Sequence, residues 1–296
     1  IPIIVFTFFI LFSNVTGTSF ATYTNRLGNS SWYYSANEYS ANLSILFPMV
    51  IYIFIDRLKP NFFSTFIFLL FTYGIISCGT KASLISMFGC LFGYVIYMIL
   101  VSKKRKLGIS FLLTMVILVI SILNFSKLPT IINMKTHYDN IVESGETNSE
   151  NRIRKLLFSE RDEFLKRIEA YDTDTIDLLV GKAYIYENNI DIIESDIFDV
   201  YYMYGLIGFI LIYGLFCYLI IKQIIYYVKN FRVAFYDSKY TLTLVSAILV
   251  ILTSLVAGHT ISSPSVAVFV AFIISIFFLY ENFENEYSYP PYHDDE

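Results

Sequence analysis

The chain has 296 residues, of which 56% are hydrophobic, 18% aromatic and 16% charged, and its formal net charge is −4. Soluble domains carry roughly 25% charged residues, so the composition excludes an ordinary soluble protein and indicates a polytopic membrane protein. The negative charge is small and concentrated in one loop and the C-terminal tail, which excludes the basic surface of a nucleic-acid-binding protein.

Apolar blocks follow one another along the chain, and a membrane-spanning helix needs about 20 such residues. The blocks are residues 1–12, 41–55, 62–77, 83–101, 107–125, 197–221, 242–258 and 266–280. The first block is short and starts at Ile1, so we expect earlier spans to be missing; it lacks the basic n-region of a signal peptide. The sequence predicts an all-α integral membrane helical bundle with about eight spans.

Lys and Arg in the short loops set the expected orientation. They gather between the second and third blocks, the fourth and fifth, and the sixth and seventh. Alternating helices place all three clusters on one side, which the positive-inside rule makes the cytoplasm. The predicted organisation is helices in 1–125, an extracytoplasmic loop in 126–195, helices in 196–280, and a disordered, acidic cytoplasmic tail in 281–296.

The polar stretch 126–195 carries nine Lys or Arg and fourteen Asp or Glu. Each charge at the centre of a bilayer costs about 2.5 to 3.5 kcal/mol, so this segment must lie at an aqueous surface. Within it, Thr147 and Glu150 have capping-box spacing and precede an apolar pattern of helical period. We therefore expect an amphipathic helix over about 148–171.

Three arginines of this predicted helix lie on or beside its apolar face. At 100° per residue, Arg161 falls inside the apolar arc and Arg154 and Arg167 fall towards its edges. One interpretation is snorkelling at the lipid surface. The other is recognition of a phosphate, because a guanidinium offers a fork of donors that suits bidentate pairing.

Other ionisable residues mark the expected outer ends of spans. Glu194, Asp196 and Asp199 surround the start of the sixth block, where they either complement the helix dipole or supply a general base. His259 is a hydrogen-bonded cap or a catalyst. Lys81 lies in a short outer turn that the positive-inside bias disfavours, and an anionic ligand would explain its place.

Taken in chain order, short motifs resemble those of the O-antigen ligase and O-antigen polymerase superfamily. They are an Asn-containing box at 35–42, a Ser-Arg-Thr-type turn at 79–83, an Arg-containing helix start at 159–164 and a Gly turn at 179–181. The ligase branch is marked by a His, then Asn, Ser or Gln, then nine residues, then Gly, two more residues, and Gly, Thr or Tyr. Glu194, Ser195, Gly205 and Gly208 match that spacing, with Glu194 standing where the His is expected.

The resemblance implies a multi-pass glycosyltransferase of the bacterial cytoplasmic (inner) membrane, acting on lipid-linked glycans outside the cytoplasm. The missing His favours a polymerase of polyprenyl-diphosphate-linked oligosaccharide repeat units, for a capsule, O-antigen or exopolysaccharide. Ligase-type transfer to a lipid or other acceptor is the alternative. A lipid-linked glycan flippase or transporter, and a receptor or scaffold, are rivals of other classes. Expected partners are the lipid-linked substrate, membrane lipid, a flippase and a chain-length regulator.

Arg161, supported by Arg167 or Lys81, is expected to bind the diphosphate, and Glu194 is the favoured base with His259 as second choice. The remaining predicted substrate-binding residues are Arg154, Asp196 and Asn37. We expect no cofactor and no metal, although Glu194 and Asp196 together could supply a magnesium site.

Overall fold

The computed structural model describes residues 2–22, 27–58, 60–101, 108–145, 148–158, 161, 174–181, 195–256 and 258–286. These residues contain helices and no strand, and an apolar helix stands at each of the eight predicted blocks, so the predicted helical membrane fold is confirmed. The helices are α1 (Pro2–Val15), α2 (Ala36–Val50, continued by a π-helix over Ile51–Arg57), α3 (Phe62–Cys78), α4 (Lys81–Val101), α5 (Ile109–Leu123), α10 (Asp196–Lys229), α12 (Ser238–Val256) and α13 (Pro264–Glu286).

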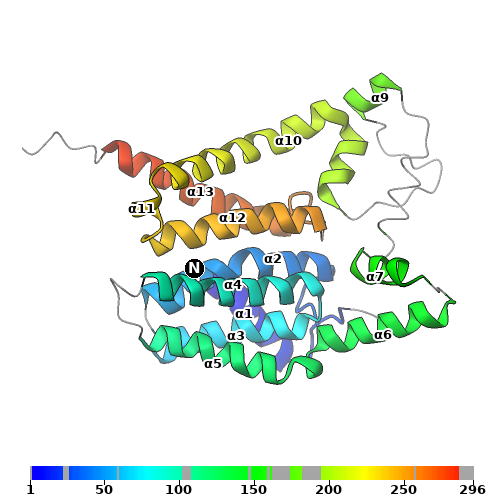
Figure 1. Cartoon of the computed structure of the whole chain (residues 1–296), viewed down its shortest axis with the longest axis horizontal. Helices are drawn as coiled ribbons and strands as arrows, with labels where there is room; N and C mark the ends of the chain where they lie inside the picture. Colours follow the sequence, from blue (N-terminus) through cyan, green and yellow to red (C-terminus); the bar gives the residue numbers. More distant parts are fainter. Residues whose placement is uncertain are drawn as a thin grey trace, which may run out of the picture.

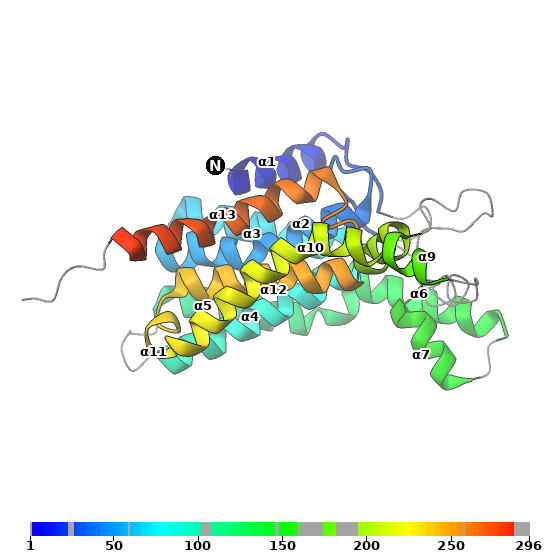
Figure 2. The same cartoon turned by 90° about the horizontal axis from the view of Figure 1, so that it is seen from above.

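Length and composition allow four of these helices in the described ranges to cross a membrane unaided. They are Ala36–Arg57, α4, α10 and α12. The helices α1, α3 and α5 and the segment Pro264–Phe277 of α13 are apolar but shorter. Together the eight make a bundle whose members run along one common direction (Figures 1 and 2).

Helix α2 lies at the centre of the bundle. Its side chains from Tyr39 to Ile51 are all buried, because α3, α4, α12 and α13 pack around it. A helix buried on every side must be apolar around its whole circumference, unlike one with a single buried stripe. Its polar members, Ser40, Asn42 and Ser44, therefore need partners within the protein, and the first two use theirs at one end of the bundle.

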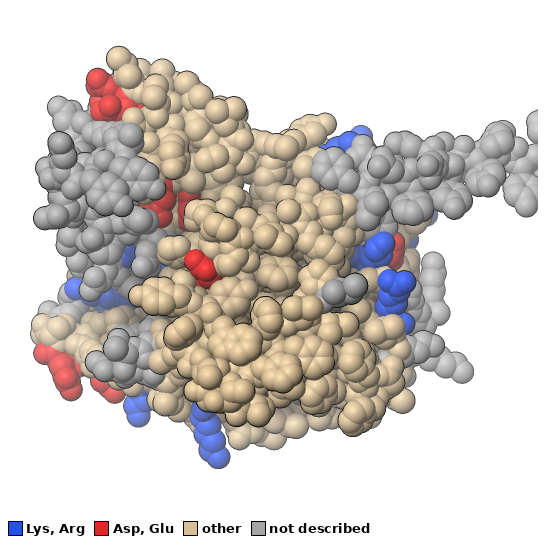
Figure 3. All heavy atoms as spheres, turned by 180° about the vertical axis from the view of Figure 1, so that it is seen from behind, with Lys and Arg blue, Asp and Glu red and all other residues tan. Residues whose placement is uncertain are grey.

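The two ends of the bundle differ. We call the end that carries α6 (Pro129–Glu143), α7 (Ser149–Phe158) and α9 (Thr175–Val180) the loop end, at the right of Figure 1. The opposite, basic end carries Arg57, Arg232 and Lys239, as alternating helices predict. Figure 3 shows that charged side chains gather towards the two ends, leaving a broad middle that is almost free of charge.

At the basic end, one carboxylate joins three helices. Asp56 accepts a hydrogen bond from the Ser238 hydroxyl at the start of α12, and its other oxygen lies 3.5 Å from the Tyr94 hydroxyl of α4. Since Asp56 lies in the π-helix that continues α2, this contact fixes α4 and α12 against the central helix at the end remote from the loops.

The polar stretch holds more helix than the sequence indicated. α7 begins at Ser149, one residue after the predicted start, and Asn148 caps it by accepting from the Glu150 N–H at 2.9 Å; Thr147 of the predicted capping box and residues 159–160 and 162–171 of the predicted helix lie outside the described residues. α6 was not predicted; it starts with Pro129 in its first turn, where a missing N–H costs nothing. Two predicted ends were too early: α10 continues to Lys229, and α13 to Glu286, six residues into the predicted disordered tail.

A backbone break at Gly205 divides α10 into two segments. Gly205 has φ 63° and ψ −171°, a conformation that is essentially restricted to glycine. Gly181, which ends α9, packs directly against it: a Cβ built on Gly205 would lie 2.4 Å from the Gly181 nitrogen and from the Leu179 carbonyl oxygen. The two glycines therefore let the backbones of α9 and α10 touch.

Replacing Gly205 with Ala is expected to separate α9 from α10 and to cost about 1–3 kcal/mol in backbone strain alone. The apparent melting temperature of the detergent-solubilised protein should fall. Gly214→Ala is the matched control, because that glycine is helical and its Cβ would meet only the Ile210 side chain, at 3.5 Å. Equal melting temperatures for the two variants would contradict the close contact.

Candidate active site at the loop end

Asn133 of α6 ties three segments together at the loop end. Its side-chain oxygen accepts from the Leu27 N–H at 2.9 Å, and its amide nitrogen donates to the carbonyls of Leu27 (2.6 Å) and Gly79 (3.2 Å). Gly79 has φ 75°, and a Cβ there would lie 2.6 Å from the Leu27 carbonyl oxygen. The turn that leads into α4 is therefore held from both sides.

Lys81 is the first residue of α4, directly after this turn. Its neighbour Thr80 is buried, and the Thr80 hydroxyl lies 2.7 Å from the hydroxyls of Ser40 and Ser83. The Lys81 ammonium donates to the Leu156 carbonyl of α7. A helix N-terminus carries partial positive charge, so a lysine there raises the local potential and favours an anion.

The segment that follows α6 is anchored at several points. His137 Nε2 lies 3.4 Å from the Lys155 carbonyl, one residue before the carbonyl that Lys81 binds. Arg154 lies on α7 with an exposed side chain. Further on, the half-buried guanidinium of Arg161 donates to the Val256 carbonyl, at the C-terminal end of α12 where helical carbonyls lack partners within the helix.

Asp196 holds the turn between α12 and α13. It is 2% exposed, and one oxygen accepts from the backbone N–H of His259 (2.7 Å) and the Ser262 hydroxyl (2.6 Å). The other accepts from the N–H groups of Thr260 (2.5 Å) and Ile261 (2.9 Å) and lies 3.4 Å from the Ser254 hydroxyl. Five donors around one carboxylate fix the turn and the start of α10 relative to each other.

His259 owes its position to this carboxylate. It has φ 53°, in the left-handed region that non-glycine residues seldom adopt, and its N–H points to Asp196. Its side chain is half-buried. Ser195 adds a second link, since its hydroxyl donates to the Leu255 carbonyl at 2.8 Å. Ser195, which follows Glu194 in the sequence, and the turn that contains His259 are therefore both tied to the C-terminal end of α12.

A polar cluster lies where α2 begins. The Glu38 carboxylate accepts from the Ser265 hydroxyl at 2.6 Å, and Asn42 donates to the Tyr33 hydroxyl at 3.2 Å and the Ser265 carbonyl at 3.4 Å. Burial raises the pKa of Tyr33 to about 12, although its bond with Asn42 lowers it somewhat. Tyr33 thus stays protonated at neutral pH. Within the described ranges, the buried side-chain oxygen of Asn42 has no hydrogen-bond partner.

The loop end brings together four predicted site residues, Lys81, Arg161, Asp196 and His259. Arg161 donates to the carbonyl of Val256 in α12, which lies three residues before His259 in the sequence. Lys81 donates to the carbonyl of Leu156 in α7, which lies five residues before Arg161. Asn37 lies at the same end, half-buried in the first turn of α2. Glu194 and Arg167 lie outside the described residues.

Asn133 is a residue of this end that the sequence did not single out, and Asn42, which ends the Asn-containing box at 35–42, was given no role of its own. The signal for Asn133 was available in part, because Pro129 followed by apolar residues at 131, 132, 134 and 141 suits a helix start. The signal for Asn42 was its position inside an apolar block, where a polar side chain needs a partner.

Comparison with known proteins gives one family. The model of a family described as "O-antigen ligase like membrane protein" matches residues 2–155 and 138–284, which together cover most of the chain. No curated protein and no solved structure matches this chain.

Replacing Asp196 with Asn is expected to loosen the turn at 258–263, because an NH₂ group then faces backbone N–H donors. An unpaired buried donor costs about 1–3 kcal/mol. The melting temperature should fall and proteolysis within the turn should speed up. Asp199→Asn, which alters an acceptor for the Ser195 N–H, is the control with the smaller expected effect. If both variants resist the protease like the parent, Asp196 does not hold the turn.

Proposed function

Because the chain belongs to the family of O-antigen ligase like membrane proteins, whose members are membrane enzymes of polysaccharide assembly, we propose that it polymerises polyprenyl-diphosphate-linked oligosaccharide repeat units. The reaction takes place at the loop end, which faces away from the cytoplasm in this proposal. The enzyme is a glycosyltransferase of the bacterial cytoplasmic membrane, and its product is a surface polysaccharide.

The observation that carries the proposal is the position of two cations. Lys81 and Arg161 come from distant parts of the sequence, and both are held at the loop end by backbone carbonyls. Ala82, the neighbour of Lys81, and Val256, whose carbonyl Arg161 binds, line one and the same cavity. Fixed cations at a membrane boundary are suited to a diphosphate whose lipid tail stays in the membrane.

The chemistry is a single displacement at the anomeric carbon of the donor sugar. A hydroxyl of the acceptor repeat unit attacks that carbon, the new glycosidic C–O bond forms, and the C–O bond to the diphosphate breaks. The leaving polyprenyl diphosphate carries the electron pair away, and Lys81 and Arg161 stabilise the charge that develops on it. The hydroxyl proton passes to a general base.

Glu194 is the proposed base, and His259 is the second choice. Asp196 serves as a positioning residue in this scheme, since its oxygens already accept from the turn that contains His259. Ser195, the residue after Glu194 in the sequence, is bonded to the end of α12. Arg167, Arg154 and Asn37 are proposed to contact the diphosphate or the sugars around this centre.

The alternative is ligase-type transfer of the glycan to another acceptor. Glu194 in place of the ligase's His favours polymerisation of repeat units over that reaction. A flippase is less well supported, because transporters place binding charges near the midplane of the membrane, whereas the described charges lie largely at the two ends (Figure 3).

Arg161→Ala is expected to reduce polymer formation roughly 100-fold, the usual effect of removing one donor to a developing negative charge. Single lipid-linked repeats should accumulate outside the cytoplasm, as lipid extraction and glycan analysis would show. Lys81→Ala should act in the same direction, whereas Lys81→Arg keeps the charge and should retain most activity. Repeats that stay on the cytoplasmic side would identify a flippase instead.

Glu194→Gln is expected to lower kcat by about 10²–10⁴ with little change in KM, because the variant keeps the shape of the side chain and loses the base. Purified enzyme and lipid-linked repeats give both constants. His259→Ala is the parallel variant. A normal kcat for Glu194→Gln together with a low kcat for His259→Ala would move the role of base to His259, and normal polymer from both Arg161→Ala and Glu194→Ala would refute the site.

A further inference from the structure

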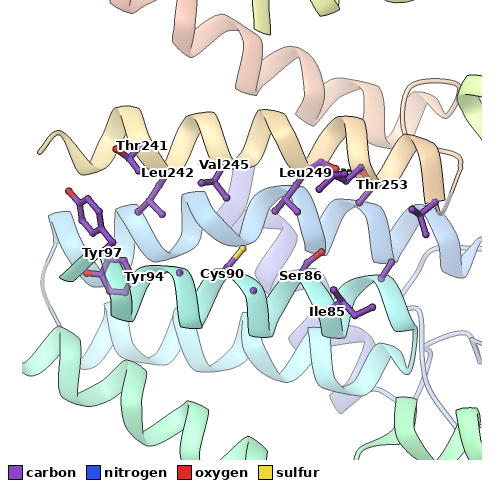
Figure 4. Close-up of a pocket in the computed structure, with 15 residues that line it drawn as sticks. Ile85, Ser86, Cys90, Tyr94, Tyr97, Thr241, Leu242, Val245, Leu249 and Thr253 are labelled. Carbon is purple, nitrogen blue, oxygen red and sulfur yellow. Dashed lines mark hydrogen bonds between the residues drawn. The ribbon is translucent and has the colours of Figure 1, made fainter. Parts of the chain in front are cut away.

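A long cavity of about 510 Å³ lies between α4 and α12 and is open along one side, where Ile85, Gly89 and Leu252 are exposed. Both helices pack on α2, whose ribbon lies behind the cavity in Figure 4. The cavity begins between Ala82 and Val256 at the loop end and reaches Tyr97 and Thr241 at the basic end. It therefore follows the bundle axis instead of forming a round chamber.

The walls of this cavity are apolar. Leu242, Val245 and Leu249 of α12 point towards α4 in Figure 4, and Ile85 of α4 lines the open edge. The Thr253 hydroxyl donates to the Leu249 carbonyl of its own helix, the Thr241 hydroxyl to the Ala234 carbonyl, and the Tyr94 hydroxyl lies on Asp56. The lining thus suits a hydrocarbon and offers few hydrogen bonds to a sugar.

Two glycines widen the cavity on the α4 side. Gly89 and Gly93 are four residues apart, so they lie on one face of the helix, and both line the cavity. A Cβ on either glycine would have no heavy atom within 4 Å. This spacing often marks a surface where two membrane helices touch, but here it opens onto the cavity between α4 and α12.

The length of the cavity distinguishes between lipid chains. Ala82 and Tyr97 are fifteen residues apart in α4, which corresponds to about 22 Å at 1.5 Å per residue. One leaflet of a bilayer is about 15 Å of hydrocarbon, half of the usual thickness. A chain that enters from the loop end and fills the cavity must therefore cross the bilayer midplane, where an ordinary acyl chain of that leaflet ends.

The mouth of the cavity at the loop end is positively charged. Lys81 precedes Ala82 in the sequence, and Arg161 binds the carbonyl of Val256; Ala82 and Val256 both line the cavity. The two cations thus lie next to residues that line the loop-end part of this apolar cavity. This arrangement complements a molecule with an anionic head and one long hydrocarbon tail.

We propose that the cavity between α4 and α12 holds the polyprenyl tail of the donor and that the enzyme selects donors by the length of this tail. The inference rests on the proposed function and adds a site for the part of the substrate that does not react. Gly89 and Gly93 leave space for the methyl branches of an isoprenoid. Tail binding in the cavity places the diphosphate between Lys81 and Arg161.

The test compares two donors that carry the same oligosaccharide diphosphate, one on a long polyprenyl tail and one on a tail of two isoprene units. The purified full chain is assayed with the parent sequence, Gly89→Leu and Gly93→Leu. Each leucine should raise KM for the long-tailed donor by about tenfold, comparable to losing burial of two methylene groups, and should leave KM for the short-tailed donor unchanged. Gly214→Leu, in α10 and outside the cavity lining, is the control.

Equal changes in KM for both donors, or no change for either, would overturn the proposal. If the parent turns over neither donor, the proposed function fails, and binding is then tested alone with a sugar-free polyprenyl diphosphate that bears a photoreactive group on its tail. Labelling of α4 or α12 would support the tail site if excess long-tailed diphosphate competes it away and excess phospholipid does not. Labelling elsewhere, or equal competition by phospholipid, would refute it.

Discussion

Backbone N–H and C=O groups must find partners within the protein wherever water is excluded, and this constraint determines how the loop end is built. Inside the bundle, helices meet the requirement by themselves. At the loop end the chain turns repeatedly, and buried side chains supply the missing partners: Asn133 for the backbone at Leu27 and Gly79, and Asp196 for the turn after α12. Each of these side chains joins segments that lie more than fifty positions apart.

The same constraint gives the cationic residues their positions. The final carbonyls of a helix lack partners within it, and the segment after α12 leaves the Val256 carbonyl to Arg161. Lys81 likewise binds a carbonyl of α7. Charged side chains that are held by the backbone keep a fixed arrangement before any ligand arrives. Such preorganisation avoids an ordering cost at the moment of binding or reaction.

The bundle was predictable from the sequence because hydrophobicity is a local property, and each apolar block became a helix. The start of α7 was predictable to within one residue for the same reason, since the contact of its cap Asn148 with the Glu150 N–H is local. α6 was missed because it is polar on average, and it is secured by the contacts of Asn133 with distant backbone. Asp196 had two plausible local interpretations, and only the fold reveals the turn 63 to 66 residues away that uses its oxygens. The Gly205 break depends on Gly181, so no window around either glycine predicts it.

The break in α10 also separates two mechanical tasks. The nine residues before Gly205 belong to the loop end through Asp196 and Ser195, whereas the longer segment after it is largely exposed on the outside of the bundle, where lipid would lie. Transmembrane helices adapt to bilayers of different thickness by tilting. The non-helical backbone at Gly205 gives the lipid-facing segment a direction of its own. The hydroxyls of Tyr213 and Ser254, 2.9 Å apart, tie this segment to α12, so any tilt has to involve α12 as well.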